Sequence, residues 1–167
     1  MTCPDRRSLL LLAGGVAGSV PAAAHARSAA AARNAALVRR YFEEVWNRGR
    51  LEVLDELLSP DYVNRTPSIP DPAPGPAGLK PIVAAMRRAF PDLRYAVEDV
   101  VATETRAVAR VVMTGTHEGD LFGLAPTGRA VRVDQINIEE IGPDGRIRQH
   151  WRVTDELALM RQLGRVA

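Results

Sequence analysis

Apolar residues recur at steps of three and four in the first half of the chain and at steps of two in the second half. The longer steps predict helices, because they place apolar side chains on one face of a helix. The expected helices cover residues 34–48, 51–58 and 79–90. Gly49 suits the left-handed position after the first helix, and Pro81 is expected in the first turn of the third.

Four segments in the second half are rich in valine and isoleucine and alternate between apolar and polar residues, which predicts strands. They cover residues 95–103, 107–117, 130–141 and 146–154. Pro143-Asp144-Gly145 predicts a hairpin between the last two. A closing helix is expected after them, with Asp155 as its N-cap. Helices followed by antiparallel strands indicate an α+β domain whose helices pack on one face of the sheet.

Two segments depart from these patterns. Five prolines between residues 66 and 78 predict an exposed, stiff loop, because proline cannot join a strand ladder or a helix interior. In the third predicted strand the apolar phase changes between Val131-x-Val133 and Ile136-x-Ile138. That change indicates a β-bulge whose neighbouring polar residues line a site.

The first 26 residues have the pattern of a bacterial export signal. Arg6-Arg7 precedes a short apolar run that contains glycine, and small residues follow up to Ala26. The paired arginines indicate the twin-arginine route, and the run is too short for a transmembrane helix. We therefore expect cleavage after Ala26, a linker or frayed helix start at 27–33, and a periplasmic or extracellular domain at 34–167. The alternatives are a retained N-terminal anchor and a wrongly assigned start codon.

Composition and charge narrow the chemistry of the mature domain. The only cysteine, Cys3, would leave with the signal, so disulfides and cysteine-based catalytic or metal sites are excluded. Loss of Asp5, Arg6 and Arg7 changes the formal charge from +2 to +1, which argues against a nucleic-acid partner. The sequence has no phosphate-binding glycine loop and no metal-ligand spacing. We expect no membrane contact after cleavage.

Several short motifs, in this order and spacing, resemble the SnoaL-like polyketide cyclase (ester cyclase) family. They are Tyr41-Phe42-x-x-Val45-Trp46-Asn47-Arg48-Gly49, Asp61-Tyr62-Val63-Asn64, Gly115-Thr116-His117-x-Gly119, Gly123-x-x-Pro126-Thr127-Gly128, and Asp155 with Gln162-Leu163-Gly164. The resemblance covers about residues 34–164. It implies a nuclear transport factor 2-like cone, in which three N-terminal helices pack on a curved antiparallel sheet and a short helix ends the chain. It also implies a small-molecule ligand in one apolar pocket, no cofactor, and a homodimer, because open sheets of this fold often pair.

The resemblance also implies an activity. Cyclases of the family close a ring of a polyketide ester by an intramolecular aldol reaction without metal or cofactor, and a carboxylate removes a proton beside a carbonyl. The family's catalytic aspartate lies two residues after a shared histidine, which is His150 here, so Arg152 holds its position. Asn137 holds the position of a second functional histidine. Arginine cannot act as a base at accessible pH.

The other acids and histidines of the last third of the chain supply the catalytic candidates. Asp155 or Asp134 would be the base, and His117 or His150 the acid or the orienting group. Each has a structural alternative. Asp155 can serve as the helix N-cap, His117 can satisfy the backbone of a turn, and Asp134 can lie on an exposed strand face.

The candidates for ligand binding come from the first helix, the segment before the proline-rich loop, and the last two strands. They are Tyr41, Trp46, Tyr62, Asn64, Gln135, Asn137, Trp151 and Arg152. Because side chains alternate along a strand, His150 and Arg152 share one face and Trp151 has the other. Only one of these sets can face the cavity unless a bulge intervenes.

Two functions from different classes fit these residues. The first is cofactor-free acid/base chemistry, an aldol cyclisation or isomerisation, on a carbonyl-bearing small molecule in an apolar pocket. The second is a non-catalytic small-molecule-binding protein that has lost the cyclase acid. The residue at position 152, where arginine replaces the family aspartate, is the feature that distinguishes the two functions. A third reading, an epoxide hydrolase-like use of an Asp–Arg pair, rests on analogy of fold alone.

Overall fold

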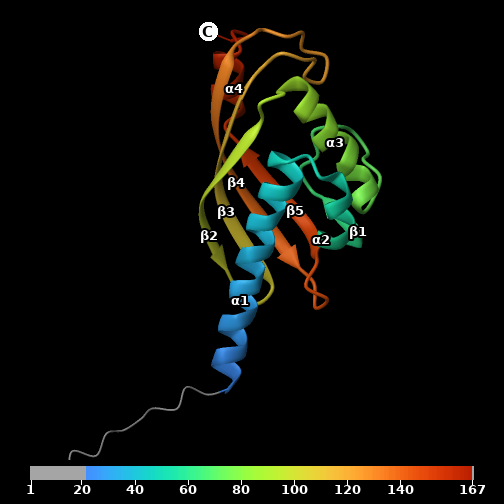
Figure 1. Cartoon of the computed structure of the whole chain (residues 1–167), viewed down its shortest axis with the longest axis vertical. Helices are drawn as coiled ribbons and strands as arrows, with labels where there is room; N and C mark the ends of the chain where they lie inside the picture. The colour runs from blue at the N-terminus through green and yellow to red at the C-terminus, as the bar shows by residue number, and fades with distance from the viewer. Residues whose placement is uncertain (1–21, 167) are drawn as a thin grey trace, which may run out of the picture.

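The computed structural model describes residues 22–166 (Figure 1), and the side chains from residue 26 onward. The predicted export signal therefore lies almost entirely outside the described residues. Helix α1 (Ala22–Arg40) includes residues 27–33, so the segment expected as a linker or helix start is helical. Its alanine content explains this, because alanine has the highest helix propensity. Among the described helices, none combines the length and apolar character that crossing a membrane requires.

The predicted first two helices are confirmed, with an irregular turn between them. α1 continues into the π-helical turn η1 (Tyr41–Asn47), and the left-handed Gly49, with φ of 71°, ends the run. The 3₁₀ turn η2 (Leu51–Val53) and α2 (Leu54–Leu57) follow. Within η1, four of seven side chains are buried: Tyr41, Phe42, Val45 and Trp46.

Helix α3 (Pro76–Ala89) begins earlier than its apolar stripe predicted. Gly75, with φ of 71°, turns the chain out of the proline-rich loop, and Pro76 takes the first helical position, where a missing N–H costs nothing. The placement of Pro81 in the first turn is therefore wrong. It lies inside the helix, on an exposed face where it removes one backbone hydrogen bond.

A five-stranded sheet forms the other half of the molecule. Its strands are β1 (Leu58–Asn64), β2 (Arg94–Ala102), β3 (Arg106–Thr116), β4 (Ala130–Ile141) and β5 (Ile147–Thr154). The order is β1-β5-β4-β3-β2; β1 runs parallel to β5 and the other neighbours are antiparallel. The four predicted strands are confirmed, as is the closing helix α4 (Glu156–Gln162). β1 was not predicted, because Ser59-Pro60 has the pattern of a helix stop; proline is tolerated in an edge strand.

β4 is regular at the position of the predicted bulge, and its pairing with β5 shifts only between Glu140 and Ile141. Its pairing with β3 runs without a shift from Arg106↔Glu140 to Thr116↔Ala130, and buried and exposed residues alternate along it. The predicted bulge is therefore wrong. Ile136 stands on the outer face, whereas polar residues on the inner face are buried: Gln135, Asn137 and Glu139. The apolar pattern changes phase because, after Val133, the inner face of this strand carries polar residues and its outer face carries apolar ones.

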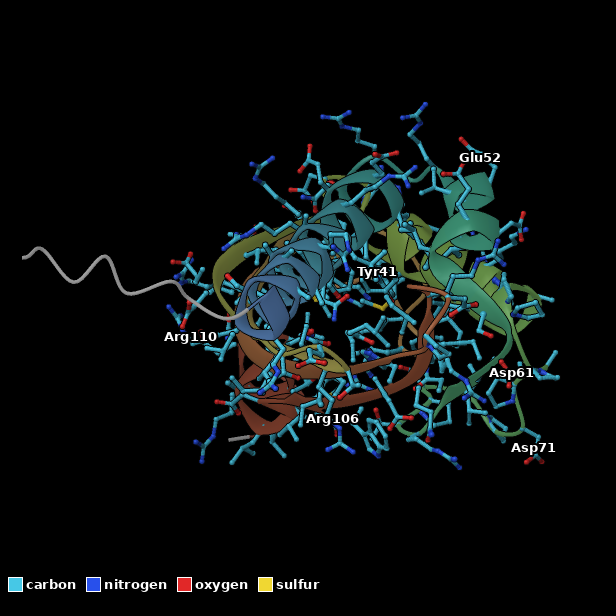
Figure 2. All side chains as sticks on the ribbon, turned by 90° about the horizontal axis from the view of Figure 1, so that it is seen from below. Tyr41, Glu52, Asp61, Asp71, Arg106 and Arg110 are labelled. Carbon is cyan, nitrogen blue, oxygen red and sulfur yellow. The ribbon has the colours of Figure 1, made fainter. Side chains whose placement is uncertain are left out.

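The helices lie along the inner face of the sheet (Figure 1). α1 packs against β2 and β3, and α4 packs against β4. The Asn34 side chain ties α1 to the β2–β3 turn by donating to the backbone oxygens of Thr103 (2.8 Å) and Glu104 (2.9 Å). Seen from below, Tyr41 lies between the helices and the sheet, whereas Arg106 and Arg110 point outward (Figure 2). The core and the site described next share the inner face.

Candidate active site

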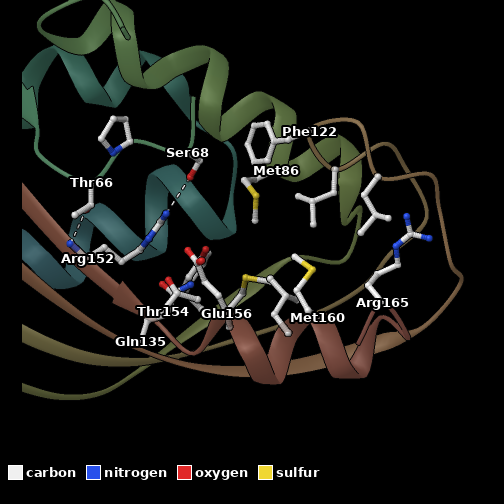
Figure 3. Close-up of a pocket in the computed structure, with 16 residues that line it drawn as sticks. Thr66, Ser68, Met86, Phe122, Gln135, Arg152, Thr154, Glu156, Met160 and Arg165 are labelled. Carbon is white, nitrogen blue, oxygen red and sulfur yellow. Dashed lines mark hydrogen bonds between the residues drawn. The ribbon is translucent and has the colours of Figure 1, made fainter. Parts of the chain in front are cut away.

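A cavity of about 650 Å³ opens between the sheet, the loop after β1, and α4 (Figure 3). This volume is in the range of small-molecule sites. Much of its wall is apolar, supplied by Met86, Met113, Leu121, Leu124, Leu159 and Met160. Its polar lining is supplied by Thr66, Ser68, Tyr95, Gln135, Arg152, Thr154, Glu156 and Arg165. A mostly apolar wall with a few polar groups suits a ligand with an extended carbon skeleton.

A second, much smaller chamber adjoins this cavity. Tyr95, Gln135 and Arg152 line both spaces, so they mark the junction between them. The chamber has a volume of about 10 Å³, enough for one atom of water size. Its remaining walls are Tyr41, Phe42, Trp46, Asn137 and His150. A single ligand oxygen fits there, while the rest of a ligand would occupy the outer cavity.

The π-helical turn supplies the aromatic wall of the chamber. The rings of Tyr41 and Trp46 meet edge to face with centroids 6.3 Å apart, and Tyr95 lies 5.3 Å from Trp46. A π-helical turn winds more residues per turn than an α-helix, and such turns are frequent at functional sites. Here the turn places its three aromatic residues, Tyr41, Phe42 and Trp46, around the same chamber as polar residues of β4 and β5.

Glu139 and His150 form a buried hydrogen-bonded pair beside the chamber. They are register partners on β4 and β5, Glu139 is 1% and His150 5% exposed, and Nδ1 of His150 lies 2.8 Å from Oε1 of Glu139. A carboxylate only accepts hydrogen bonds, so Nδ1 carries the proton of this bond. In the neutral ring Nε2 is then unprotonated, and His150 is the one histidine that lines the chamber.

Three tyrosines near this pair remain protonated at ordinary pH. Burial raises the pKa of Tyr41, and the charge of Glu139 raises it further. Burial also raises the pKa of Tyr62, with a smaller contribution from Tyr41 and Glu139. Burial raises the pKa of Tyr95 to about 12. These phenols can donate hydrogen bonds and do not act as anionic bases.

Several buried donors around the chamber have no hydrogen-bond partner among the described residues. They include Nδ2 of Asn137 and the hydroxyl of Tyr62. A buried polar group without a partner costs about 1–3 kcal/mol. Asn137 lines the chamber, so a ligand oxygen placed there would lie near a donor that the described residues leave unpaired.

Arg152 stands at the junction of the two spaces. Its Nη2 donates to Oγ of Ser68 (2.9 Å), and its backbone N–H donates to Oγ1 of Thr66 (2.8 Å), both in the loop after β1 (Figure 3). In the part of the chain that the structure describes, no carboxylate lies within ion-pair distance of its guanidinium. The half-buried cation therefore faces the ligand space without a counter-ion.

The structure separates the candidates for the acid/base group. His150 lines the chamber, but His117 does not line either space. The ring of His117 is fully buried against Phe90, with centroids 5.3 Å apart, and its Nδ1 accepts from the backbone N–H of Thr127 (3.3 Å). His117 thus satisfies the backbone of a turn, which was its structural alternative.

Neither candidate aspartate lies in the cavity. Asp155 caps α4, and its side chain accepts from the backbone N–H of Ala158 (2.9 Å). Asp134 is exposed on the outer face of β4, so the expectation that it lines the pocket is wrong. It was placed inward by the supposed bulge, and regular alternation places Gln135 inward instead.

Six of the eight predicted binding residues lie at or beside the cavity. Tyr41, Trp46, Gln135, Asn137 and Arg152 line the cavity or chamber, and the buried Tyr62 lies beside them.

The other two lie elsewhere. Trp151 stands on the outer face of β5, because His150 and Arg152 take the inner one. Asn64 holds the loop after β1, since its Oδ1 accepts from the backbone N–H of Thr66 (3.0 Å).

Sequence reasoning missed Glu139, Ser68 and Glu156. Glu139 could have been found by extending the alternation of Gln135 and Asn137 by one more step along β4. The positions of Ser68 and Glu156 depend on how the loop and α4 close over the sheet, and no local pattern contains that information. Among the described residues, no group of three or more metal-binding side chains is placed to hold an ion.

Comparison with known families agrees with this architecture. The family described as SnoaL-like polyketide cyclase matches residues 36–163. This chain belongs to that family. It has the nuclear transport factor 2-like α+β fold that the motifs implied, with the parallel edge strand β1 as an addition to the expected antiparallel sheet.

Curated relatives of this SnoaL-like protein are cyclases. The nogalonic acid methyl ester cyclase of Streptomyces nogalater is 32% identical over 121 residues, which are 71% of this chain and 89% of the relative. The aklanonic acid methyl ester cyclase AcmA of Streptomyces galilaeus is 33% identical over 132 residues, 77% of this chain and 89% of the relative.

Among solved structures, TsrD from Streptomyces laurentii is 30% identical with a TM-score of 0.74, covering 81% of this chain and 97% of that one. A SnoaL-like protein from Jannaschia sp. CCS1 is 25% identical with a TM-score of 0.75, covering 84% of this chain and 98% of that one.

Proposed function

We propose that this SnoaL-like protein is an ester cyclase-type enzyme that moves a proton beside a carbonyl group of a small molecule and so promotes aldol ring closure or isomerisation without a cofactor. Family membership and the names of the cyclase relatives support this class of reaction. The observation that carries the proposal is the buried Glu139–His150 pair at the chamber. It supplies a base although Arg152 holds the position of the family aspartate.

In the proposed step, Nε2 of His150 takes a proton from the carbon next to the ligand carbonyl. The electron pair of the broken C–H bond moves into the carbonyl, which becomes an enolate. Glu139 holds the ring through Nδ1 and stabilises the imidazolium that forms, as a carboxylate does in other histidine-based sites. In a ring closure the enolate carbon then attacks a second carbonyl, and the new alkoxide takes the proton back from His150.

An unpaired donor matches the charge that this step creates. Asn137 lines the chamber, which admits one oxygen, and its Nδ2 has no partner among the described residues. Donors fixed in a buried site stabilise a developing oxyanion more strongly than water does. The carbonyl oxygen of the ligand would occupy the chamber, while its carbon skeleton rests on the apolar wall of the outer cavity.

Ring closure of nogalonic acid methyl ester and of its free acid tests the proposal. We expect His150→Asn to lower the rate by about 100-fold or more, the usual contribution of a general base. Asparagine keeps a donor toward Glu139, so the variant should fold. The matched control is Asp155→Asn, which preserves the helix cap and should retain the wild-type rate. A rate that persists in His150→Asn and disappears in Asp155→Asn would contradict the assignment.

The alternative function, a non-catalytic binding protein, predicts a different result. Wild-type protein would then bind both compounds and convert neither, and His150→Asn would change affinity alone. The alternative is considered because Arg152 takes the position of the family aspartate, and arginine cannot act as a base. The same assay distinguishes the two, because only the enzyme gives a product that accumulates with time.

A further inference from the structure

Of the three residues at the junction, Tyr95, Gln135 and Arg152, Arg152 is the charged one. Arg152 lines both the chamber and the outer cavity, and within the described part of the chain its side chain bonds only the neutral hydroxyl of Ser68. Taking a cation partly out of water without a counter-ion is costly. A ligand that brings a negative charge would remove this cost.

A second donor points to the same place. Thr154 lies two residues after Arg152 on β5, on the same inner face. Thr154 lines the outer cavity, and its buried Oγ1 has no partner among the described residues. A guanidinium and a hydroxyl on neighbouring inward positions form a site for an oxyanion with two oxygens.

The acidic group in the same cavity does not neutralise this site. Glu156 lies at the mouth in the first turn of α4 and is exposed to solvent. A carboxylate in the first turn of a helix is stabilised by the helix dipole, and Glu156 makes no ion pair with Arg152. Arg165 also lines the cavity, so the lining carries two cationic side chains, Arg152 and Arg165, and one anionic side chain, Glu156.

We propose that the ligand of this pocket is a carboxylic acid, bound as its anion by Arg152 and Thr154, and not a methyl ester. This refines the proposed function by naming the substrate class, and rests on it for the location of the site. The carboxylate would lie at the junction, where the planar guanidinium can bind both of its oxygens. The reacting carbonyl would then reach the inner chamber. Methylation of the acid removes the charge and one acceptor.

A matched pair of probes tests the proposal directly. Affinity is measured by calorimetry for anthraquinone-2-carboxylate and its methyl ester, and for 2-naphthoate and its methyl ester. Wild-type protein should bind the acid about tenfold or more tightly than the ester. Arg152→Gln should weaken acid binding by about 10- to 100-fold and leave ester binding unchanged. Unchanged ester binding also shows that the pocket of the variant is intact.

Two further variants separate charge from folding. Arg152→Lys keeps the charge and should retain part of the preference for the acid. Arg110→Gln removes an arginine from the outer face of the sheet and should change neither affinity. Equal binding of acid and ester by wild-type protein, equal loss of both in Arg152→Gln, or failure of either acid to bind would overturn the proposal.

Different measurements would refute the two proposals, the enzyme assignment and the anion site. Acid binding that depends on Arg152 can be present in a protein without turnover, which would refute the enzyme assignment alone. Ring closure that depends on His150 with no preference for the acid would refute the anion site alone.

Discussion

At the scale of single residues, the Glu139–His150 pair carries both stability and chemistry. Glu139 is 1% exposed, and its partner in the pair is the His150 ring at 2.8 Å. Because the pair is buried on adjacent strands, removing one member leaves a polar group of the other without water or a partner. Substitutions at Glu139 can therefore separate the contribution of the hydrogen bond from that of the charge.

Glu139→Ala should lower the free energy of unfolding by about 1–3 kcal/mol, since Nδ1 of His150 loses its acceptor. Glu139→Gln keeps an acceptor oxygen and should cost less stability. It should nevertheless slow ring closure, because the imidazolium loses its stabilising charge. Urea unfolding and turnover of both variants check this. Equal turnover of Glu139→Gln and wild type would show that the carboxylate charge takes no part in the reaction.

The buried tyrosines predict a loss of stability in alkali. Burial raises the pKa of Tyr95 to about 12 and also raises those of Tyr41 and Tyr62. In the unfolded chain these phenols titrate near about 10, so above that pH the unfolded state releases protons that the folded state keeps. The stabilising contribution is therefore complete below about pH 10 and falls as pH rises toward 12.

Urea unfolding at about pH 9 and about pH 11 measures this decline. Tyr95→Phe serves as the comparison, since it removes one of the titrating groups and keeps the ring. The decline should be smaller in the variant than in the wild type. Identical pH dependence of the two proteins would contradict the assignment of Tyr95 as a phenol that stays protonated in the fold.

At the scale of elements, periodicity was enough for most of the fold. Three helices, four strands and the cap of α4 follow from spacing alone, because burial of one face imposes a period on the sequence. It failed at β4, where the inner face is polar and the outer face carries Ile136 and Ile138. Alternation fixes which residues share a face but does not show which face is inward when the site itself is polar.

The candidate site was predictable only in part. Tyr41, Trp46, Asn137 and His150 were named from sequence and do meet around one chamber. The pairing of Glu139 with His150 depends on the register of β4 and β5, which no local pattern records. The two aspartates and His117 were attractive as chemistry but are explained by a cap, an exposed face and a turn.

The cap of α4 gives a prediction at this scale. Asp155→Ala should lower the free energy of unfolding by about 1 kcal/mol, whereas Asp155→Asn should stay close to wild type, because asparagine is an equally good N-cap. Thermal unfolding of both variants, with turnover measured alongside, checks this. A strong loss of turnover in Asp155→Asn without loss of stability would restore Asp155 as a catalytic candidate.

At the scale of the whole molecule, the outer face of the sheet carries apolar residues that no part of the described chain covers. Val101 is 65% and Val153 71% exposed. Beside them, Asp99 and Arg110 are register partners of opposite charge. A second copy related by a two-fold axis could cover the apolar residues and place each arginine near an acid of its partner. The homodimer expected from the open sheet remains a prediction, as does export with cleavage after Ala26.

Light scattering coupled to gel filtration tests the dimer. Wild-type protein should have the mass of two chains, and Val153→Glu should reduce it to one, because a charge in the centre of the apolar face would lose its water on pairing. Ser68 lies away from this face, in the loop at the cavity, so Ser68→Ala is the matched control and should remain dimeric. A wild-type mass of one chain would contradict the prediction.

The central claim is that His150, held by Glu139, removes a proton beside a carbonyl. The most direct test follows by NMR the exchange of that proton of nogalonic acid, or of its methyl ester, for deuterium in D₂O, because exchange reports proton removal even when no ring closes. We predict that wild-type protein accelerates exchange and that His150→Asn lowers the acceleration by about 100-fold or more. Exchange at the wild-type rate in His150→Asn, or no acceleration by the wild type, would contradict the account.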